Sequence, residues 1–158
     1  MKRLLFILAF VCASFVGAQA QTKEQTKFEV CDSSNIYRVE DTLLADKGFG
    51  SAPLVETNPQ FTGGVEALQK FFDDNLKLGD EAKSVFGRIP IALTVNCKGK
   101  VGDFKFLGKV FPEMAQEIIK VAEKMPDWKA GEAKGKAVDT VVRLSFTISQ
   151  GKAKVSFK

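Results

Sequence analysis

The first clear hydrophobic pattern in the chain follows the glycine pair Gly63-Gly64, where apolar side chains recur every three or four residues. This is the spacing of one helix face, and it predicts a helix over 65–77. Glu66 lies in the first turn of that helix, where the helix dipole favours an anion. A short helical turn is expected over 80–86, and the glycine pair is interpreted as a tight start of the first helix.

Strict alternation of apolar and polar residues then takes over, as expected for strands with one buried face. It runs over 89–97 and again over 101–107, with a Lys-Gly turn between them, and predicts a hairpin. A second amphipathic helix is expected from Pro112 to Met125. It should end there because Pro126 disfavours helical geometry in the residue before it.

Alternation returns over 138–148 and, after a reversal at Gln150-Gly151, over 152–158. The last segment alternates lysine or serine with apolar residues, which is typical of an edge strand protected by charge. We therefore expect it to pair with the strand before it. The order of elements indicates an α+β fold in which two helices pack on one face of a small antiparallel sheet.

The N-terminal part of the chain has weaker patterns. Residues 1–20 contain two early basic residues, an apolar run over 4–17 and the small-x-small sequence Ala18-Gln19-Ala20, which together are typical of a cleavable signal peptide. The apolar run is shorter than the roughly 20 residues that span a bilayer. We expect a mature chain without a membrane anchor that begins at Gln21. Residues 21–58 would form a leader with at most one or two strands, one near Ile36–Val39.

The three cysteines of the chain help to predict the cellular compartment of the protein. Cys12 lies in the predicted signal peptide, where lipid attachment is the alternative, although the bulky Val11 before it disfavours this. Cys31 and Cys97 remain as an even pair in an oxidising compartment. A disulfide between them and two unpaired buried thiols are both open, because the sequence does not reveal the distance between their Cα atoms.

Composition limits the chemistry. The chain has 158 residues, 45% of them apolar, which suits a single domain. It has no histidine, which excludes Ser-His-Asp and Cys-His nucleophiles and histidine metal ligands. It also lacks a P-loop motif and the four cysteines of an all-cysteine zinc site. Without residues 1–20 it carries 21 basic and 19 acidic side chains, which does not favour nucleic acid. We expect no cofactor, no metal and no catalysis, with a carboxylate-dependent hydrolase as the weakest alternative.

Two motifs occur in order around the predicted hairpin. One is P-x-F-x-G-G-x-x-A-L over 59–68, and the other is M-P-x-W-x-x-G-x-x-x-G-K over 125–136. Together they resemble the C-terminal domain of TonB, the energy transducer of Gram-negative outer-membrane transport, over about residues 59–148. Residues 149–158 extend beyond the resemblance as an additional strand. The motif positions with structural roles are Gly63, Gly64, Pro126, Trp128 and Gly131. Trp128 is interpreted as a core or rim anchor whose indole N–H meets a carbonyl, with ligand contact as the alternative.

The resemblance implies a periplasmic, non-catalytic module that binds the periplasm-facing segment of an outer-membrane receptor by strand addition, or β-augmentation. The docking edge it implies is the strand 138–148, through the backbone groups of Val141, Val142, Arg143, Leu144 and Ser145. Residues 152–158 would compete for that edge, and a homodimer formed by strand exchange stays open. The alternative is an envelope ligand-binding or assembly protein that keeps only the fold, since the proline-rich spacer of a full TonB is absent from this sequence.

Overall fold

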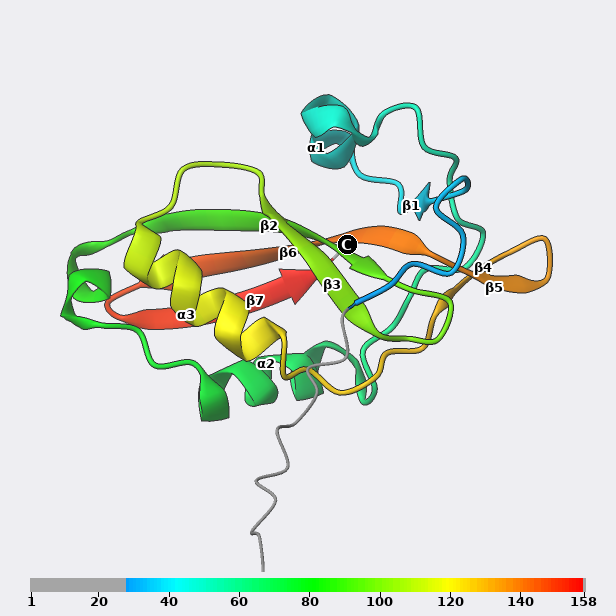
Figure 1. Ribbon diagram of the computed structural model, residues 1–158. Coiled ribbons are helices and arrows are strands. Elements are labelled where there is room, and N and C mark those ends of the chain that lie inside the picture. The colour runs from blue at the N-terminus through cyan, green and yellow to red at the C-terminus, as the bar shows by residue number, and fades with distance from the viewer. Residues whose placement is uncertain (1–27, 158) are drawn as a thin grey trace, which may run out of the picture.

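The structure is a computed structural model that describes residues 28–157 (Figure 1). The predicted signal peptide with Cys12, the expected mature terminus Gln21 and the last residue Lys158 lie outside these residues. The elements, in chain order, are β1 (Tyr37–Arg38), α1 (Thr42–Leu44), η1 (Ala45–Phe49), α2 (Gly64–Asn75), η2 (Asp80–Ser84), β2 (Gly87–Val95), β3 (Val101–Phe106), α3 (Pro112–Ala122), β4 (Gly131–Ala133), β5 (Lys136–Val138), β6 (Thr140–Ser149) and β7 (Lys152–Phe157).

A five-stranded sheet organises the domain, with β6 and β2 at its centre. β3 pairs with the free side of β2, and β1 and β7 share the other side of β6. β1 lies parallel to β6 at Thr140 and Val141, whereas β7 lies antiparallel to it from Leu144 to Ser149. The sheet is therefore mixed, and the expectation of a purely antiparallel sheet was wrong. A two-residue strand is too short for its sequence to reveal its direction.

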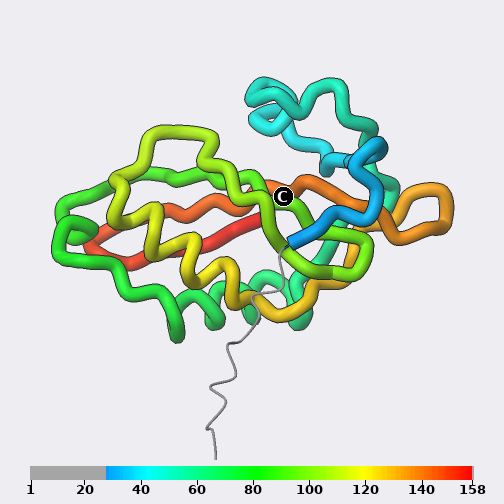
Figure 2. Tube along the Cα trace, in the orientation of Figure 1, coloured from blue at the N-terminus to red at the C-terminus, as the bar shows by residue number. Residues whose placement is uncertain are grey.

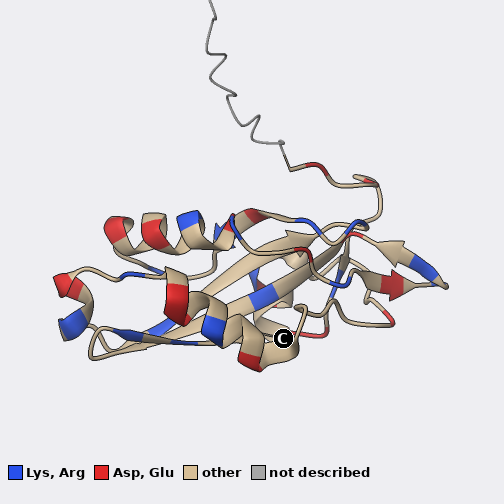
Figure 3. Cartoon of the chain, turned by 90° about the horizontal axis from the view of Figure 1, so that it is seen from below, with Lys and Arg blue, Asp and Glu red and all other residues tan. Residues whose placement is uncertain are grey.

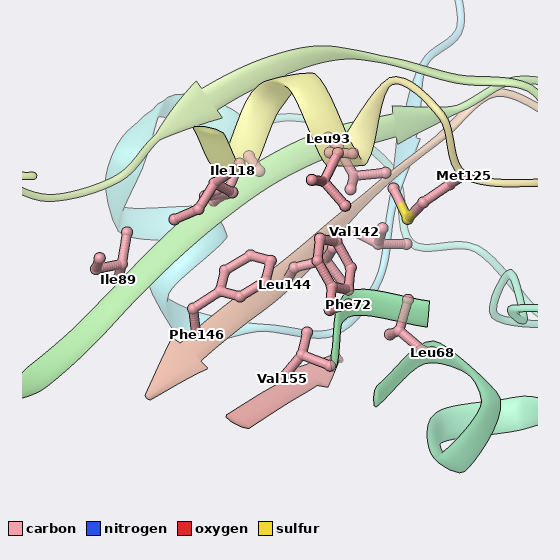
Figure 4. Packing of buried hydrophobic residues seen from close by; sticks show 14 of the residues in the cluster. Leu68, Phe72, Ile89, Leu93, Ile118, Met125, Val142, Leu144, Phe146 and Val155 are labelled. Atoms are coloured by element: carbon pink, nitrogen blue, oxygen red, sulfur yellow. The ribbon is translucent and has the colours of Figure 1, made fainter. Parts of the chain in front are cut away.

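Both long helices cover one face of the sheet (Figures 1 and 4). Side chains from β2 and β6 meet Leu68 and Phe72 of α2 and Ile118 of α3 in one buried cluster. Phe72 packs edge-to-face on Phe146, with ring centroids 4.8 Å apart. This arrangement confirms the α+β class. Acidic and basic residues are interspersed along both helices (Figure 3).

The opposite face of β6 carries a partly buried ion pair. Arg143 donates to the Asp41 carboxylate from Nε at 2.9 Å and from Nη2 at 2.7 Å. The second oxygen of Asp41 accepts from the Leu44 N–H and so caps α1. The helical turns over 42–49 were not predicted, because α1 is too short for a hydrophobic period to be visible. They follow β1, which lies within the strand expected near residues 36–39.

The long strand expected over 138–148 is divided at Asp139. Val138 ends β5, which forms a small hairpin with β4, and β6 begins at Thr140. Asp139 is 1% exposed, and its carboxylate accepts the N–H groups of Asp32 and Cys97 at 2.7 and 2.9 Å. These long-range bonds interrupt the strand, so the predicted boundary was wrong. The helices also end two or three residues earlier than expected, at Asn75 and Ala122.

Cys31 and Cys97 form a disulfide, with Cα atoms 6.0 Å apart. Of the two alternatives that the sequence leaves open, the structure has the disulfide and not two free thiols. The bond ties the N-terminal segment to the residues that follow β2, beside Asp139. Within residues 28–157, no helix combines the length and the apolar character of a membrane span.

Candidate peptide-docking edge

The five residues expected to dock a partner, Val141 to Ser145, lie inside the sheet. On one side β2 pairs with all five, for example Leu93 with Val142 and Ile91 with Leu144. On the other side β1 covers Val141, and β7 covers Leu144 and Ser145. β2 therefore flanks the whole segment on one side, whereas on the other side no strand pairs with Val142 or Arg143 within residues 28–157. A partner can pair with Leu144 and Ser145 only after β7 has left.

β7 occupies the edge of β6 in the way the sequence predicts for the C-terminal segment. The register runs from Ser149 opposite Lys152 to Leu144 opposite Phe157. Gln150 and Gly151 have φ values of 51° and 75°, as a two-residue hairpin turn of the primed type requires. Of the six side chains of β7 only Val155 is fully buried. The pairing over 152–157 confirms this prediction.

A side chain of α2 covers the outer edge of β7. Gln69 Oε1 accepts the Val155 N–H at 2.7 Å, and Gln69 Nε2 donates to the Ala153 carbonyl at 3.1 Å. In a parallel sheet, a residue that lies beside Lys154 would donate to the carbonyl of residue 153 and accept from the N–H of residue 155. The Gln69 amide makes the same two hydrogen bonds. Asp73 orients Gln69 by accepting from the same Nε2 at 2.7 Å. Gln69 therefore acts as a latch that fastens β7 to α2.

Packing is looser at the hairpin end of β7. A groove of about 830 Å³ separates the C-terminal half of α2 from the hairpin, with Phe72, Leu76 and Leu78 on one wall and residues 149–154 on the other. The hairpin itself is held by the Gly151 N–H, which donates to the Ala82 carbonyl at 3.1 Å.

The other end of β7 rests on Trp128. This residue is 4% exposed, and its ring lies 5.5 Å from both Phe61 and Phe157, measured between centroids. Trp128 is thus a core anchor, as expected. Its indole Nε1 has no hydrogen-bond partner among residues 28–157, so the expected carbonyl partner was wrong. The Trp128 backbone instead donates to the Gly99 carbonyl at 2.8 Å.

The two sequence motifs meet in space. Gln60 and Lys129 exchange backbone hydrogen bonds at 3.0 and 2.8 Å, and Thr62 Oγ1 donates to the Asp127 carbonyl at 2.8 Å. The motifs therefore form one joint, which places the start of α2 beside Trp128. Neither motif alone reveals this contact, because the two are more than 50 residues apart in the chain.

Glycines allow the close packing of this joint. Gly63 and Gly64 have φ values of 87° and 77°, a conformation that disfavours other residues, and they permit the predicted tight start of α2. At Gly131 a Cβ atom would lie 2.5 Å from Thr140 Oγ1, so the side chain of any other residue would collide with β6. Pro126 is exposed just after the last turn that follows α3.

Chemically reactive groups are sparse in the described region. Cys31, Cys97 and Asp139 cluster within 4.8 Å, but the disulfide leaves no thiolate for a metal, and both Asp139 oxygens accept backbone N–H groups. Hydrogen bonds from Asn35 and Ser34 lower the pKa of Asp32, and Asp74 raises the pKa of Lys70. Both pKa shifts arise between exposed residues that are close together in the chain, so neither shift marks a reactive centre.

Comparison of the chain with protein-family models, curated proteins and solved structures found no match in any of the three. The resemblance to the TonB C-terminal domain therefore stands on the residues of the two motifs themselves.

Proposed function

We propose that the chain is a non-catalytic interaction module of the TonB C-terminal type, which binds an extended segment of a partner as an added strand on β6. By resemblance, the partner is the periplasm-facing segment of an outer-membrane receptor, in transmembrane transport. The observation that carries the proposal is that β7 already lies on β6 as an added strand would. The Cys31–Cys97 disulfide supports an oxidising compartment such as the periplasm.

Exchange of β7 for a partner strand would keep the backbone hydrogen bonds on this edge of β6. Both strands offer the same backbone donors and acceptors to β6, so the exchange preserves the ladder. What is lost is specific to β7: the burial of Val155, the contact of Phe157 with Trp128, and the two bonds to Gln69. β7 has a high local concentration, on the order of millimolar for a short connection, which a partner must overcome.

If a partner strand replaces β7, the docking residues lie closer to the C-terminal end of β6 than the sequence predicts. Release of β7 would free the backbone of Leu144 to Ser149, because these residues pair with it. β1 would still cover Val141, whose carbonyl accepts the Val39 N–H at 3.1 Å. Of the five expected docking residues, Leu144 and Ser145 therefore belong to the freed edge.

A reversible lock on β7 tests the proposal. Thr147 and Lys154 are directly opposite each other in the register, and both are exposed. Cysteines at both positions should form a cross-strand disulfide that holds β7 on β6. Calorimetry would measure the binding of a synthetic peptide that has the sequence of a receptor's periplasm-facing segment. We expect the wild type to bind and the oxidised double variant not to bind.

The single variants Thr147→Cys and Lys154→Cys serve as matched controls, because neither can form the link, and both should bind like the wild type. Unchanged binding by the locked protein would place the docking site away from β6. An absence of binding by every form, including the wild type, would favour the second candidate function. That candidate is an envelope protein that binds a small ligand, and the specific observation in its favour is an apolar pocket at the start of β2.

A further inference from the structure

This apolar pocket has a volume of about 440 Å³ and is lined by residues at the start of β2 and of α3. Both elements begin at the same end of the sheet (Figures 1 and 2). Ile89 and Met114, 6% and 1% exposed, contribute its buried apolar side chains. Phe86 and Phe111 also line it and are 69% and 56% exposed, more than any other large apolar side chain in residues 28–157. Two solvent-exposed aromatic rings that line one pocket are typical of a binding site.

A backbone edge of β2 is open at the same place. β3 pairs with β2 only as far as Ile91, and the last bond on that side runs from the Leu107 N–H to the Pro90 carbonyl at 2.9 Å. Backbone groups along a strand alternate between its two neighbours. Since Pro90 faces the β3 side, the N–H of Arg88 faces that side too, beyond the end of β3. No hydrogen bond within residues 28–157 uses this N–H, so an unpaired donor adjoins the pocket.

The charged residues that line the pocket are all basic. Arg88 and Lys109 line it, and no acidic residue does. Neither cation forms an ion pair with any residue of the described chain. The pocket thus combines an apolar interior with a positively charged rim, which is complementary to a molecule with an apolar chain and an anionic head.

We propose that this pocket, the Phe86–Phe111 pocket, binds a free single-chain amphiphile with an anionic head, of the fatty-acid class. The chain lies over Ile89 and Met114 between the two phenyl rings. The carboxylate accepts from the Arg88 N–H and is neutralised by Lys109. The volume falls within the roughly 300–1,000 Å³ of small-molecule pockets. This inference does not depend on strand addition at β6.

Three probes with one chain length and different heads test the charge requirement. Dodecanoate, dodecanol and dodecylammonium would be titrated into the intact protein by calorimetry, below the concentration at which the two ions form micelles and below the solubility limit of dodecanol. We expect one dodecanoate per chain, and at least about tenfold weaker binding of the other two, which corresponds to about 1.4 kcal/mol. Equal binding of all three heads would overturn the assignment of the rim as an anion site.

A pocket-filling variant tests the location. Gly87 lines the pocket in an extended strand, and a Cβ there would have no heavy atom within 4 Å, so Gly87→Val should fold normally and occupy the hollow. We expect Gly87→Val, Phe111→Ala and Lys109→Glu each to weaken dodecanoate binding at least about tenfold, or about 1.4 kcal/mol. Leu54→Ala removes another exposed apolar side chain, and Lys124→Glu makes the same charge change elsewhere. Both should bind like the wild type.

Two results would reject the proposal outright. One is dodecanoate binding by Gly87→Val with wild-type affinity. The other is binding to anionic phospholipid vesicles without binding of the monomeric probe, which would make the two phenylalanines a membrane-surface contact.

Discussion

Gln69, in the middle of α2, accepts a hydrogen bond from the backbone N–H of Val155 at 2.7 Å. Together with the bond that it donates to Ala153, this lets one side chain take the place of a neighbouring strand. An uncovered edge strand is a template for pairing with another chain. Gln69 therefore has two consequences: it protects the outer edge of β7, and it holds β7 on β6.

Replacement of Gln69 should loosen β7. We expect Gln69→Ala to lower the free energy of unfolding by about 1–3 kcal/mol, for two hydrogen bonds at about 0.5–1.5 kcal/mol each. Amide exchange at Val155 should accelerate, and a peptide that competes with β7 should bind more tightly. Hydrogen exchange and calorimetry measure the two effects. Lys70→Ala is the control, because its exposed pair with Asp74 contributes little. Slow exchange at Val155 in Gln69→Ala would show that β7 is held by other contacts.

Removal of β7 should expose the docking edge completely. A chain that ends at Ser149 lacks the intramolecular competitor, and we expect a receptor-derived peptide to bind it more tightly than the intact protein. Calorimetry of both chains measures the difference, after circular dichroism has shown that the shortened chain is folded. Equal affinities would mean that the peptide does not compete with β7.

Truncation of Trp128 should be among the most destabilising changes. Trp128→Ala leaves a cavity between Phe61 and Phe157, and we expect a loss of about 3–5 kcal/mol in the free energy of unfolding. Trp128→Phe should cost clearly less, because it retains a ring and removes the unpartnered indole N–H. Denaturant titration measures both values. A midpoint that barely moves for Trp128→Ala would contradict the core role.

Loss of the disulfide should also destabilise the domain. Cys31 and Cys97 are separated by 66 positions, and closing a loop of that length corresponds to about 4 kcal/mol of chain entropy. We expect Cys31→Ser/Cys97→Ser to lower the free energy of unfolding by about this amount, and reductant to lower the wild type equally. Reductant should not change the double variant, and a further loss in that variant would contradict the assignment.

The predicted signal peptide leads to a measurement on the exported protein. We expect its intact mass to correspond to a chain that begins at Gln21, because Ala18-Gln19-Ala20 has the pattern of a cleavage site. Retention of residues 1–20, or the added mass of a lipid on Cys12, would contradict this.

Local periodicity was enough to predict the two long helices, the β2–β3 hairpin and the C-terminal strand. Leu68 and Phe72 lie on one helix face because helix geometry places residues three or four apart on the same side. Likewise Val142, Leu144 and Phe146 share one face of β6 because strands alternate. These patterns depend only on neighbouring residues, so they are visible before folding.

Long-range pairing decided the rest. Asp139 divides a strand whose alternation looks continuous, because its carboxylate meets N–H groups of Asp32 and Cys97, 107 and 42 positions away. The sequence marks Gln69 only as a polar residue within a predicted helix, and its latch on Val155 exists only once α2 lies beside β7. The direction of β1 and the hollow between Phe86 and Phe111 likewise depend on which segments the folded chain brings together. The sequence by itself determined the two long helices, the long strands and their buried faces, because helix and strand periods are local. Only the tertiary structure decided which edges and pockets stay open, because that depends on contacts between distant segments.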